Sequence, residues 1–172
     1  MASIWKKGTL AGVCESVKYG YTASASQDEV GPHLLRITDI VPSSIDWLTV
    51  PYCTVDDADY EKYKLEEGDI VIARTGATAG YGKLIREDKD SVFASYLVRF
   101  RVDTNMADPV YVGTIIESDI YKTYIKSQIT GSAQPQANAK ILGSFTFPLP
   151  SIDEQKRIAH VLGCLDDKIE LN

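Results

Sequence analysis

The chain has 172 residues, enough for one domain with a real hydrophobic core, and its composition (44% apolar, 24% charged) is ordinary for a globular protein. It has no apolar run near the roughly 18 residues of a membrane span, and Met1–Leu10 lacks the hydrophobic region of a signal peptide, so we expect a cytoplasmic protein with no membrane partner. Cys14, Cys53 and Cys164 are too scattered for a disulfide framework or a zinc site and indicate reduced thiols.

The net charge of −6 argues against nucleic-acid binding, but the acids are concentrated in two places. Seven acids and two lysines lie from Asp56 to Asp69, and five acids and three bases lie from Ser151 onward. The rest of the chain therefore has a net charge of +1, which allows a basic face without demonstrating one. Weak or partner-dependent DNA binding is compatible with this distribution.

The first half of the chain is expected to mix short helices and strands. Trp5–Val17 could begin with a short apolar helix or a turn, and Leu34–Ile40 is a strand candidate. The acidic stretch Thr54–Leu65 has the pattern of a surface helix with two tyrosines turned inward. Ile70–Ala73 is predicted to be a short buried strand after a Glu-Gly-Asp turn.

The second half is expected to continue as strands followed by helices. Leu84 and Ile85 resume a strand, and the alternating pattern of Val92–Val102 predicts one long strand. Apolar residues at four-residue spacing predict a single helix of about five turns over Pro109–Ile129, with its proline in the first turn. Phe145–Phe147 is predicted to be a short strand. The fold class is therefore α+β: a small, twisted, mainly antiparallel sheet or half-barrel with flanking helices.

The last 22 residues are predicted to form one helix. Ser151 stands three residues before Glu154, the spacing of a capping box, and two prolines precede it. An apolar seam then repeats at intervals of four, three and four residues, as in a coiled coil: Ile158, Leu162, Leu165 and Ile169. Two readings stay open, a helix that packs on its own domain and the start of a coiled coil that needs a second helix. We assign residues 1–150 to one domain and residues 151–172 to the start of this projecting helix.

Two glycine-rich loops contain the residues best suited to binding chemistry. In Ala73–Gly80, Arg74, Thr75 and Thr78 follow a buried strand, and such groups contact phosphate or guanine when small neighbours allow a close approach. The loop lacks the Gly-Lys-Ser/Thr ending of a P-loop. In Thr130–Asn138, the amides of Gln134 and Gln136 could pair with adenine edges. Either loop could instead serve turn geometry and backbone hydrogen bonding alone.

Three stretches, in order, resemble the specificity subunit of type I restriction–modification systems: GDIVIARTGATAG, TGSAQPQANAKILGSFTFPLP and SIDEQKRIAHVLGCLDDKIELN. The N-terminal WKKGTLAGVCESVKYGYTASAS is similar to the start of that family's target recognition domain. The resemblance implies a non-catalytic chain with one such domain, which reads one half of a bipartite sequence in double-stranded DNA, followed by the start of a spacer helix. It is expected to be an excised N-terminal half or, alternatively, a short half-subunit that dimerises.

The resemblance also implies partners and suggests contact residues. The partners would be methyltransferase subunits, a restriction subunit reached through the complex, and a second recognition domain or a second copy joined through the spacer helix. No cofactor is expected on this chain. The residues chosen by their chemistry as DNA contacts are Lys18, Tyr19, Tyr21, Thr22, Arg74, Thr75, Thr78 and Lys83, with Gln134 and Gln136 as second choices.

Two other functions remain as alternatives. A plain protein–protein interaction module would use only the terminal helix and would have no affinity for DNA. A metal-dependent nuclease would need Asp69 together with Glu87 and Lys89, which imitate the Asp…Glu-x-Lys arrangement around Mg²⁺. Glu87–Asp90, however, has the pattern of an exposed turn, whereas catalysis requires those side chains on a rigid strand.

Overall fold

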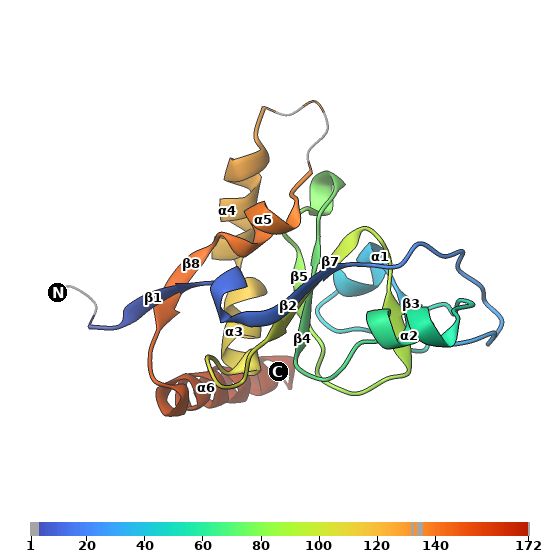
Figure 1. Cartoon of the computed structure of the whole chain (residues 1–172). Coiled ribbons are helices and arrows are strands. Elements are labelled where there is room, and N and C mark those ends of the chain that lie inside the picture. Colours follow the sequence, from blue (N-terminus) through green and yellow to red (C-terminus); the bar gives the residue numbers. More distant parts are fainter. Residues whose placement is uncertain (1–3, 132, 134–135, 172) are drawn as a thin grey trace.

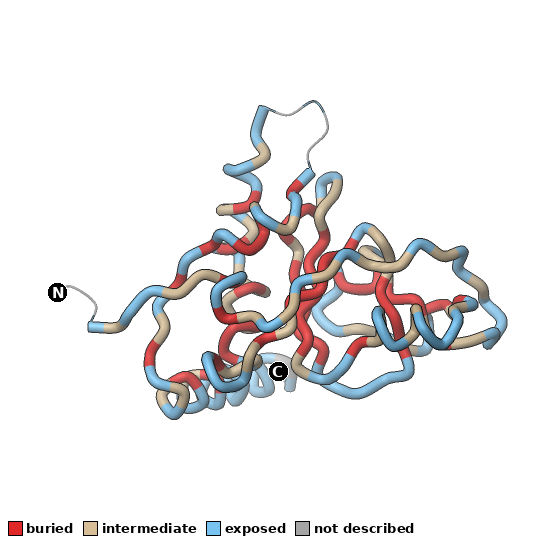
Figure 2. Tube along the Cα trace, in the orientation of Figure 1, coloured by how far each residue is buried: buried red, intermediate tan, exposed pale blue. Residues whose placement is uncertain are grey.

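A four-stranded antiparallel sheet forms the middle of the molecule (Figure 1). The computed structural model describes residues 4–131, 133 and 136–171. The strands follow the order β2 (Cys14–Tyr19), β7 (Leu97–Val102), β4 (Asp69–Ala73) and β5 (Gly82–Leu84). Every residue of β4 is buried, because the strand lies inside the sheet and both of its faces are covered (Figure 2). The α+β class and the buried strand over Ile70–Ala73 are thus confirmed.

Helices cover one face of this sheet. They are the 3₁₀ turn η1 (Ala11–Val13), α3 (Pro109–Ile116), α4 (Asp119–Ile129) and α5 (Ala139–Gly143), and they share the larger hydrophobic core with residues such as Phe100 and Val98. The ladder of β1 (Lys6–Thr9) with β8 (Thr146–Leu149) closes this side. The N-terminal stretch, where a helix or turn was expected, is therefore mainly strand with one 3₁₀ turn.

The single helix expected over Pro109–Ile129 is wrong. Helix α3 ends before Glu117, and the Ser118 hydroxyl then accepts a hydrogen bond from the Tyr121 N–H and caps a new helix, α4. Glu117 turns back to the sheet and accepts from the Leu84 N–H at 2.8 Å. The two helices can then cover different parts of the core while the periodicity continues across the break.

A second, smaller layer covers the opposite face. It contains α1 (Ile37–Ile40), α2 (Asp57–Tyr63) and a parallel pair of strands, β3 (His33–Leu35) and β6 (Ser91–Phe93). The expected strand over Leu34–Ile40 is shorter than predicted, because Arg36 caps α1 after three strand residues. The long strand expected over Val92–Val102 is also wrong. A turn at residues 94–96 divides it into β6 and β7, which belong to different sheets.

The helix α6 (Ile152–Glu170) is attached to the body by its first two turns. Gln155 is fully buried: its side chain accepts from the Asp108 N–H and donates to the Pro150 carbonyl, both at 2.8 Å. Beyond Ala159 the helix is exposed throughout its described side chains (Figure 2). Within the described part of the chain, no helix is both long and apolar enough to cross a membrane.

Candidate nucleic-acid interface

The two glycine-rich loops, far apart in sequence, meet at one end of the molecule. Thr75 and Gln136 form an isolated antiparallel bridge, and the Ala137 N–H donates to the Arg74 carbonyl at 2.8 Å. The 3₁₀ turn η2 (Gly76–Thr78) therefore lies beside the segment that leads into α5, at the end opposite α6 (Figure 1). We name this end, formed by residues 19, 74–80, 94–96 and 136–140, the loop face.

Glycine is required where the first loop returns to the sheet. Gly80 has a φ of +90°, and a Cβ there would lie 2.9 Å from the Ile125 side chain. Its N–H donates to the Ala73 carbonyl at 2.8 Å. The sharp return holds Arg74 and Thr75 at the mouth of the loop and leaves Gly76 open to solvent, with no atom within 4 Å of a Cβ built there.

Arg74 is held in place by both its backbone and its side chain. Its N–H donates to the Tyr96 carbonyl at 3.1 Å, and its Nε donates to the Ser95 carbonyl at 3.1 Å. The guanidinium carbon lies 5.3 Å from the Tyr19 ring centroid and 5.8 Å from that of Tyr96, within cation–π range of both. The side chain is thus orientated before any ligand arrives.

Tyr19 links three segments of the loop face. Its ring contacts Arg74, and its hydroxyl accepts from the Ala139 N–H at 2.9 Å, at the start of α5. Asn138 caps the same helix by accepting from the Ile141 N–H at 2.9 Å. Tyr19 is nevertheless 45% exposed, so part of the residue remains accessible to a partner.

Tyr96 is a residue of the loop face that the sequence reading missed. Its side chain is 57% exposed and stands beside Arg74. It was read as part of a continuous strand, whereas it lies in the turn between β6 and β7. The sequence shows only a glycine at position 20, and the structure gives its reason: a Cβ there would lie 2.0 Å from the Ala94 carbonyl oxygen, at this turn.

The loop face is built from segments without acids. Residues 16–27, 70–86, 91–102 and 120–152 contain no Asp or Glu, although the whole chain has a net charge of −6. Two bases of the loop face, Arg74 and Lys140, make no ion pair with any residue in the described ranges. The same holds for Lys126 in α4, which follows Ile125, the residue against Gly80 of the first loop. A face of this kind attracts polyanions despite the negative total charge.

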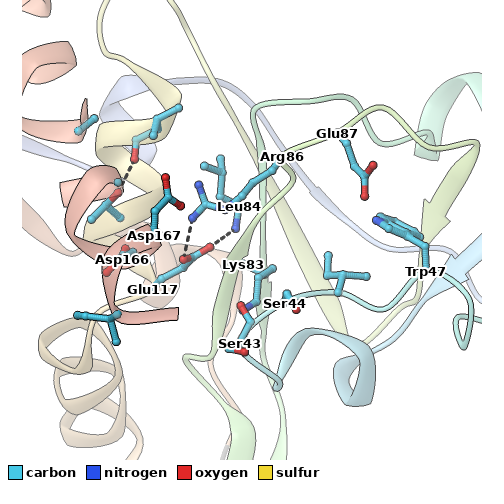
Figure 3. Close-up of a pocket in the computed structure, with 16 residues that line it drawn as sticks. Ser43, Ser44, Trp47, Lys83, Leu84, Arg86, Glu87, Glu117, Asp166 and Asp167 are labelled. Atoms are coloured by element: carbon cyan, nitrogen blue, oxygen red, sulfur yellow. Dashed lines mark hydrogen bonds and ion pairs between the residues drawn. The ribbon is translucent and has the colours of Figure 1, made fainter. Parts of the chain in front are cut away.

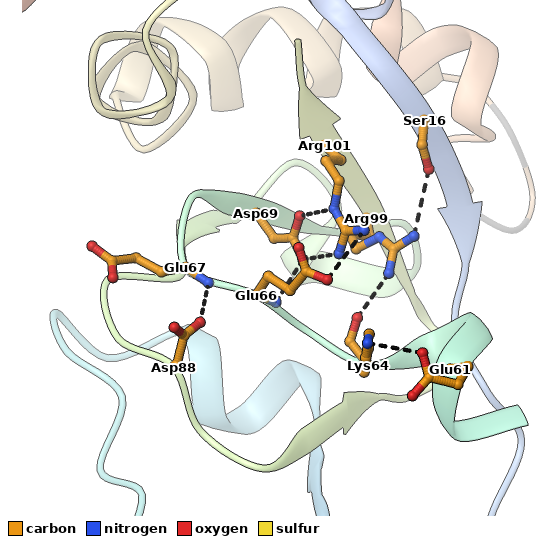
Figure 4. Close-up of polar contacts among 9 residues, drawn as sticks. All are labelled: Ser16, Glu61, Lys64, Glu66, Glu67, Asp69, Asp88, Arg99 and Arg101. Atoms are coloured by element: carbon orange, nitrogen blue, oxygen red, sulfur yellow. Dashed lines mark hydrogen bonds and ion pairs between the residues drawn. The ribbon is translucent and has the colours of Figure 1, made fainter. Parts of the chain in front are cut away.

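The acids lie elsewhere, and some of those in the acidic stretch from Asp56 to Asp69 take part in a network with two arginines (Figure 4). Asp69 is buried and accepts two hydrogen bonds of 2.8 Å from Arg101, which also pairs with Glu66 at 3.7 Å. The Asp69 carboxylate raises the pKa of Arg101 through this hydrogen bonding. Arg99 is buried beside them and donates to the Lys64 carbonyl at 2.9 Å, and burial lowers its pKa.

This network also removes the support for the nuclease alternative. Both carboxylate oxygens of Asp69 are engaged by Arg101, and one also accepts from the Glu66 N–H. Glu87 and Lys89 pair with each other at 3.6 Å on the exposed turn. Among the residues that the structure describes, no group of three or more His, Cys, Asp or Glu side chains could hold a metal ion.

The structure separates several of the other predicted contacts from the loop face. Lys18 alternates with Tyr19 in β2 and therefore points to the opposite side of the sheet. Tyr21 packs on Tyr63 with ring centroids 5.2 Å apart, and burial followed by the carboxylates of α2 raises its pKa. Thr22 is exposed in the segment that follows.

Three further predicted DNA contacts, Thr78, Gln134 and Gln136, belong to the two glycine-rich loops. Thr78 donates to the Thr75 carbonyl at 3.2 Å and stabilises the first loop. Gln136 is exposed on the loop face, whereas Gln134 lies outside the described residues.

The geometry does not support Lys83 as a DNA contact. It is 8% exposed, and its ammonium donates to the Pro42 and Ser43 carbonyls at 2.8 and 3.0 Å. Burial lowers its pKa. It forms part of the wall of a cleft of about 660 Å³ between the body and α6, also bordered by Trp47 and Asp166 (Figure 3). Lys83 thus braces the segment before Trp47.

Comparison with known proteins gives one consistent family. The type I restriction modification DNA specificity domain matches residues 3–172. The chain is 29% identical over 173 residues to a putative type I restriction enzyme specificity subunit, MjaX, of Methanocaldococcus jannaschii, covering 96% of the chain and 40% of that protein. It is 26% identical over 141 residues to the EcoBI specificity subunit of Escherichia coli, covering 81% of the chain and 30% of the relative.

Solved structures share the fold at lower identity. The HsdS subunit from Thermoanaerobacter tengcongensis aligns with a TM-score of 0.71 and 17% identity, over 99% of this chain and 44% of that one. The S subunit of a type I restriction–modification system from M. genitalium gives a TM-score of 0.66 and 16% identity, over 96% and 40%. The chain spans less than half the length of the relatives that it matches.

Proposed function

The chain belongs to the family of type I restriction–modification DNA specificity domains, and from this premise we propose that it recognises one half of a bipartite sequence in double-stranded DNA. The loop face is the proposed contact surface. The observation that carries the proposal is the meeting of the two glycine-rich loops at an acid-free end, with Arg74 orientated between two tyrosine rings. Phosphate contacts by its bases would fix the position on the duplex, and groups at the loop tips would reach base edges.

The helix α6 is proposed to connect this reading domain to the rest of an assembly. Leu162, Leu165 and Ile169 are 38%, 51% and 72% exposed, and Ile158, also in the seam, is only partly buried. Of the two readings of this helix, the partial exposure of the seam favours a spacer helix over one that packs on its own domain. Its partner would be the corresponding helix of a second recognition domain or of a second copy.

In the proposed assembly this chain catalyses no reaction. Methyltransferase subunits would dock on the assembled specificity subunit and methylate adenine, and a restriction subunit would act through the complex. The chain would determine only where they act. The competing reading, a protein–protein module, would use the same exposed seam but would leave the loop face without a function.

Selection of binding sites from a pool of randomised duplexes, with the complete chain at low salt, tests the proposal. A single half-site offers few phosphate contacts, so we expect weak binding that enriches a short motif and falls with added salt by about one decade of affinity per decade of salt for each phosphate contact. Lys126→Ala and Lys140→Ala should weaken binding to all duplexes about equally and each reduce the salt slope by about 1. Absence of any enriched motif, or an affinity unaffected by these substitutions, would overturn the proposed function.

A further inference from the structure

Within the loop face, the geometry points to Arg74 as the reader of a guanine base, with Tyr19 and Tyr96 as positioning residues. This inference rests on the proposed function and names a particular base contact for it. It follows from how the Arg74 backbone is fixed, which of its donors are already used, and what its remaining donors can recognise.

The Arg74 backbone is anchored on both sides. Its N–H is bonded to the turn that contains Tyr96, and its carbonyl accepts from Ala137 in the second loop. It also directly follows β4, the fully buried strand of the central sheet. The Arg74 side chain therefore extends from a rigid backbone position. Base recognition requires such rigidity, because an error of about 1 Å in the position of a contacting group weakens a site.

The side chain itself is only partly committed. Its Nε donates to the Ser95 carbonyl at 3.1 Å, and the two terminal nitrogens make no hydrogen bond with the portion of the chain that the structure describes. These two nitrogens form the end of the guanidinium fork, which can donate two parallel hydrogen bonds. Contacts with both tyrosine rings restrict the direction in which the fork points.

Two parallel donors select guanine among the four bases. In the major groove guanine presents two acceptors, O6 and N7, whereas adenine presents one acceptor beside a donor. Thymine offers a single acceptor next to its methyl group, and cytosine offers a donor. A phosphate contact would not require the side chain to be orientated in advance, since a flexible lysine serves that purpose as a point charge. The fixed orientation therefore favours a base over a phosphate.

The test uses the duplex enriched by the complete chain, with each guanine replaced in turn by 7-deazaguanine, which keeps base pairing but lacks the N7 acceptor. At one position, we expect this replacement to weaken binding of the parent chain about five- to a hundredfold, as measured by fluorescence anisotropy. Arg74→Met, which keeps a long side chain but loses every donor, should bind the unmodified duplex no better than the parent binds the modified one. It should then show no further loss with 7-deazaguanine.

Two further substitutions test positioning. Tyr96→Leu should reduce the difference between the guanine and 7-deazaguanine duplexes while leaving the salt slope unchanged, whereas loss of a phosphate contact would change the slope. Arg86→Met is the matched control, because Arg86 pairs with Glu117 at 3.1 Å and lies outside the loop face, and it should leave the ratio of the two affinities unchanged.

The outcomes separate this inference from the function on which it rests. If no motif is enriched, the proposed function fails. If a motif is enriched but no guanine is sensitive, or Arg74→Met remains as sensitive to 7-deazaguanine as the parent, the inference fails and the function stands. Unfolding of each variant in urea verifies that the loss is local, and retained salt-dependent binding to unselected duplexes provides a second verification.

Discussion

Replacement of Gln155 by methionine should weaken the attachment of α6 to the body and lower the free energy of unfolding. Methionine nearly preserves the side-chain volume but removes both hydrogen bonds made by the buried amide. A buried polar group left without a partner costs about 1–3 kcal/mol. The Pro150 carbonyl is buried and bears this cost in full, whereas the half-buried Asp108 can regain some hydration. The free energy of unfolding should therefore fall by about 2–4 kcal/mol.

Urea titration followed by tryptophan fluorescence measures this change, with the slope of the transition verifying that the compactness of the unfolded state is unaltered. In a domain of this size the corresponding fall in Tm is about 5–15 °C. Gln128→Met is the matched control, because Gln128 is exposed on α4, and it should stay within about 0.5 kcal/mol of the parent. A loss below about 0.5 kcal/mol for Gln155→Met would refute the anchoring role.

A second replacement at the same position separates the two hydrogen bonds. Gln155→Glu keeps an acceptor for the Asp108 N–H but places a carboxylate oxygen against the Pro150 carbonyl oxygen. Near neutral pH it should destabilise the chain more than Gln155→Met, because a buried charge then lacks a partner. The difference should shrink as the pH is lowered and the carboxylate becomes protonated. Equal stability of the two variants at every pH would contradict the prediction that a carboxylate at position 155 is buried without a partner for its charge.

Three other predictions concern the core, the helix α6 and the thiols. Tyr121→Phe removes a hydroxyl that donates to the Leu142 carbonyl at 2.8 Å in the core, so the free energy of unfolding should fall by about 1–3 kcal/mol in the same urea titration. Leu165→Ser combined with Ile169→Ser should change that free energy by less than about 1 kcal/mol but weaken any self-association measured by sedimentation, because both side chains are exposed. Burial, reinforced by Asp69, raises the pKa of Cys14 to about 12, so at pH 8 its thiol should react with a disulfide reagent far more slowly than exposed Cys164. The same raised pKa predicts that Cys14 contributes stability that is lost as the pH rises from about 9 towards 12.

Local sequence signals predicted the parts of the fold that depend on neighbouring residues. Ile70–Ala73 reads as a buried strand because four apolar residues follow a turn, and Ser151 begins α6 by accepting from the Glu154 N–H. The same local reasoning failed where the chain changes partners. The stretch Val92–Val102 was predicted to be one strand, yet it forms two, because β6 pairs in parallel with β3 while β7 enters the central sheet. A hydrophobic period of two residues indicates a strand, but it does not specify which other strand pairs with it.

The candidate site shows the same division. Arg74 could be selected from its position after a buried strand in a glycine-rich loop, but its approach to Tyr96 depends on a turn between strands of different sheets. Lys83 is equally basic in sequence, and only the position of the Pro42 carbonyl shows that its charge is used internally. Conversely, the sequence alone shows that the segments that contribute to the loop face contain no Asp or Glu. Those segments also form most of the central sheet, so only the fold shows which of their residues meet at one end.

The β1–β8 ladder affects how this domain could be exchanged. Lys6 lies opposite Leu149 and Thr9 opposite Thr146, so the path into the domain and the path out of it run antiparallel, side by side. Insertions are tolerated best where the two ends of a segment lie close together, because the surrounding chain keeps its course. Residues 6–149 therefore have the geometry of a transferable cassette. Recombination at these two strands could replace the reading surface in a single event while the helix that follows remains in register.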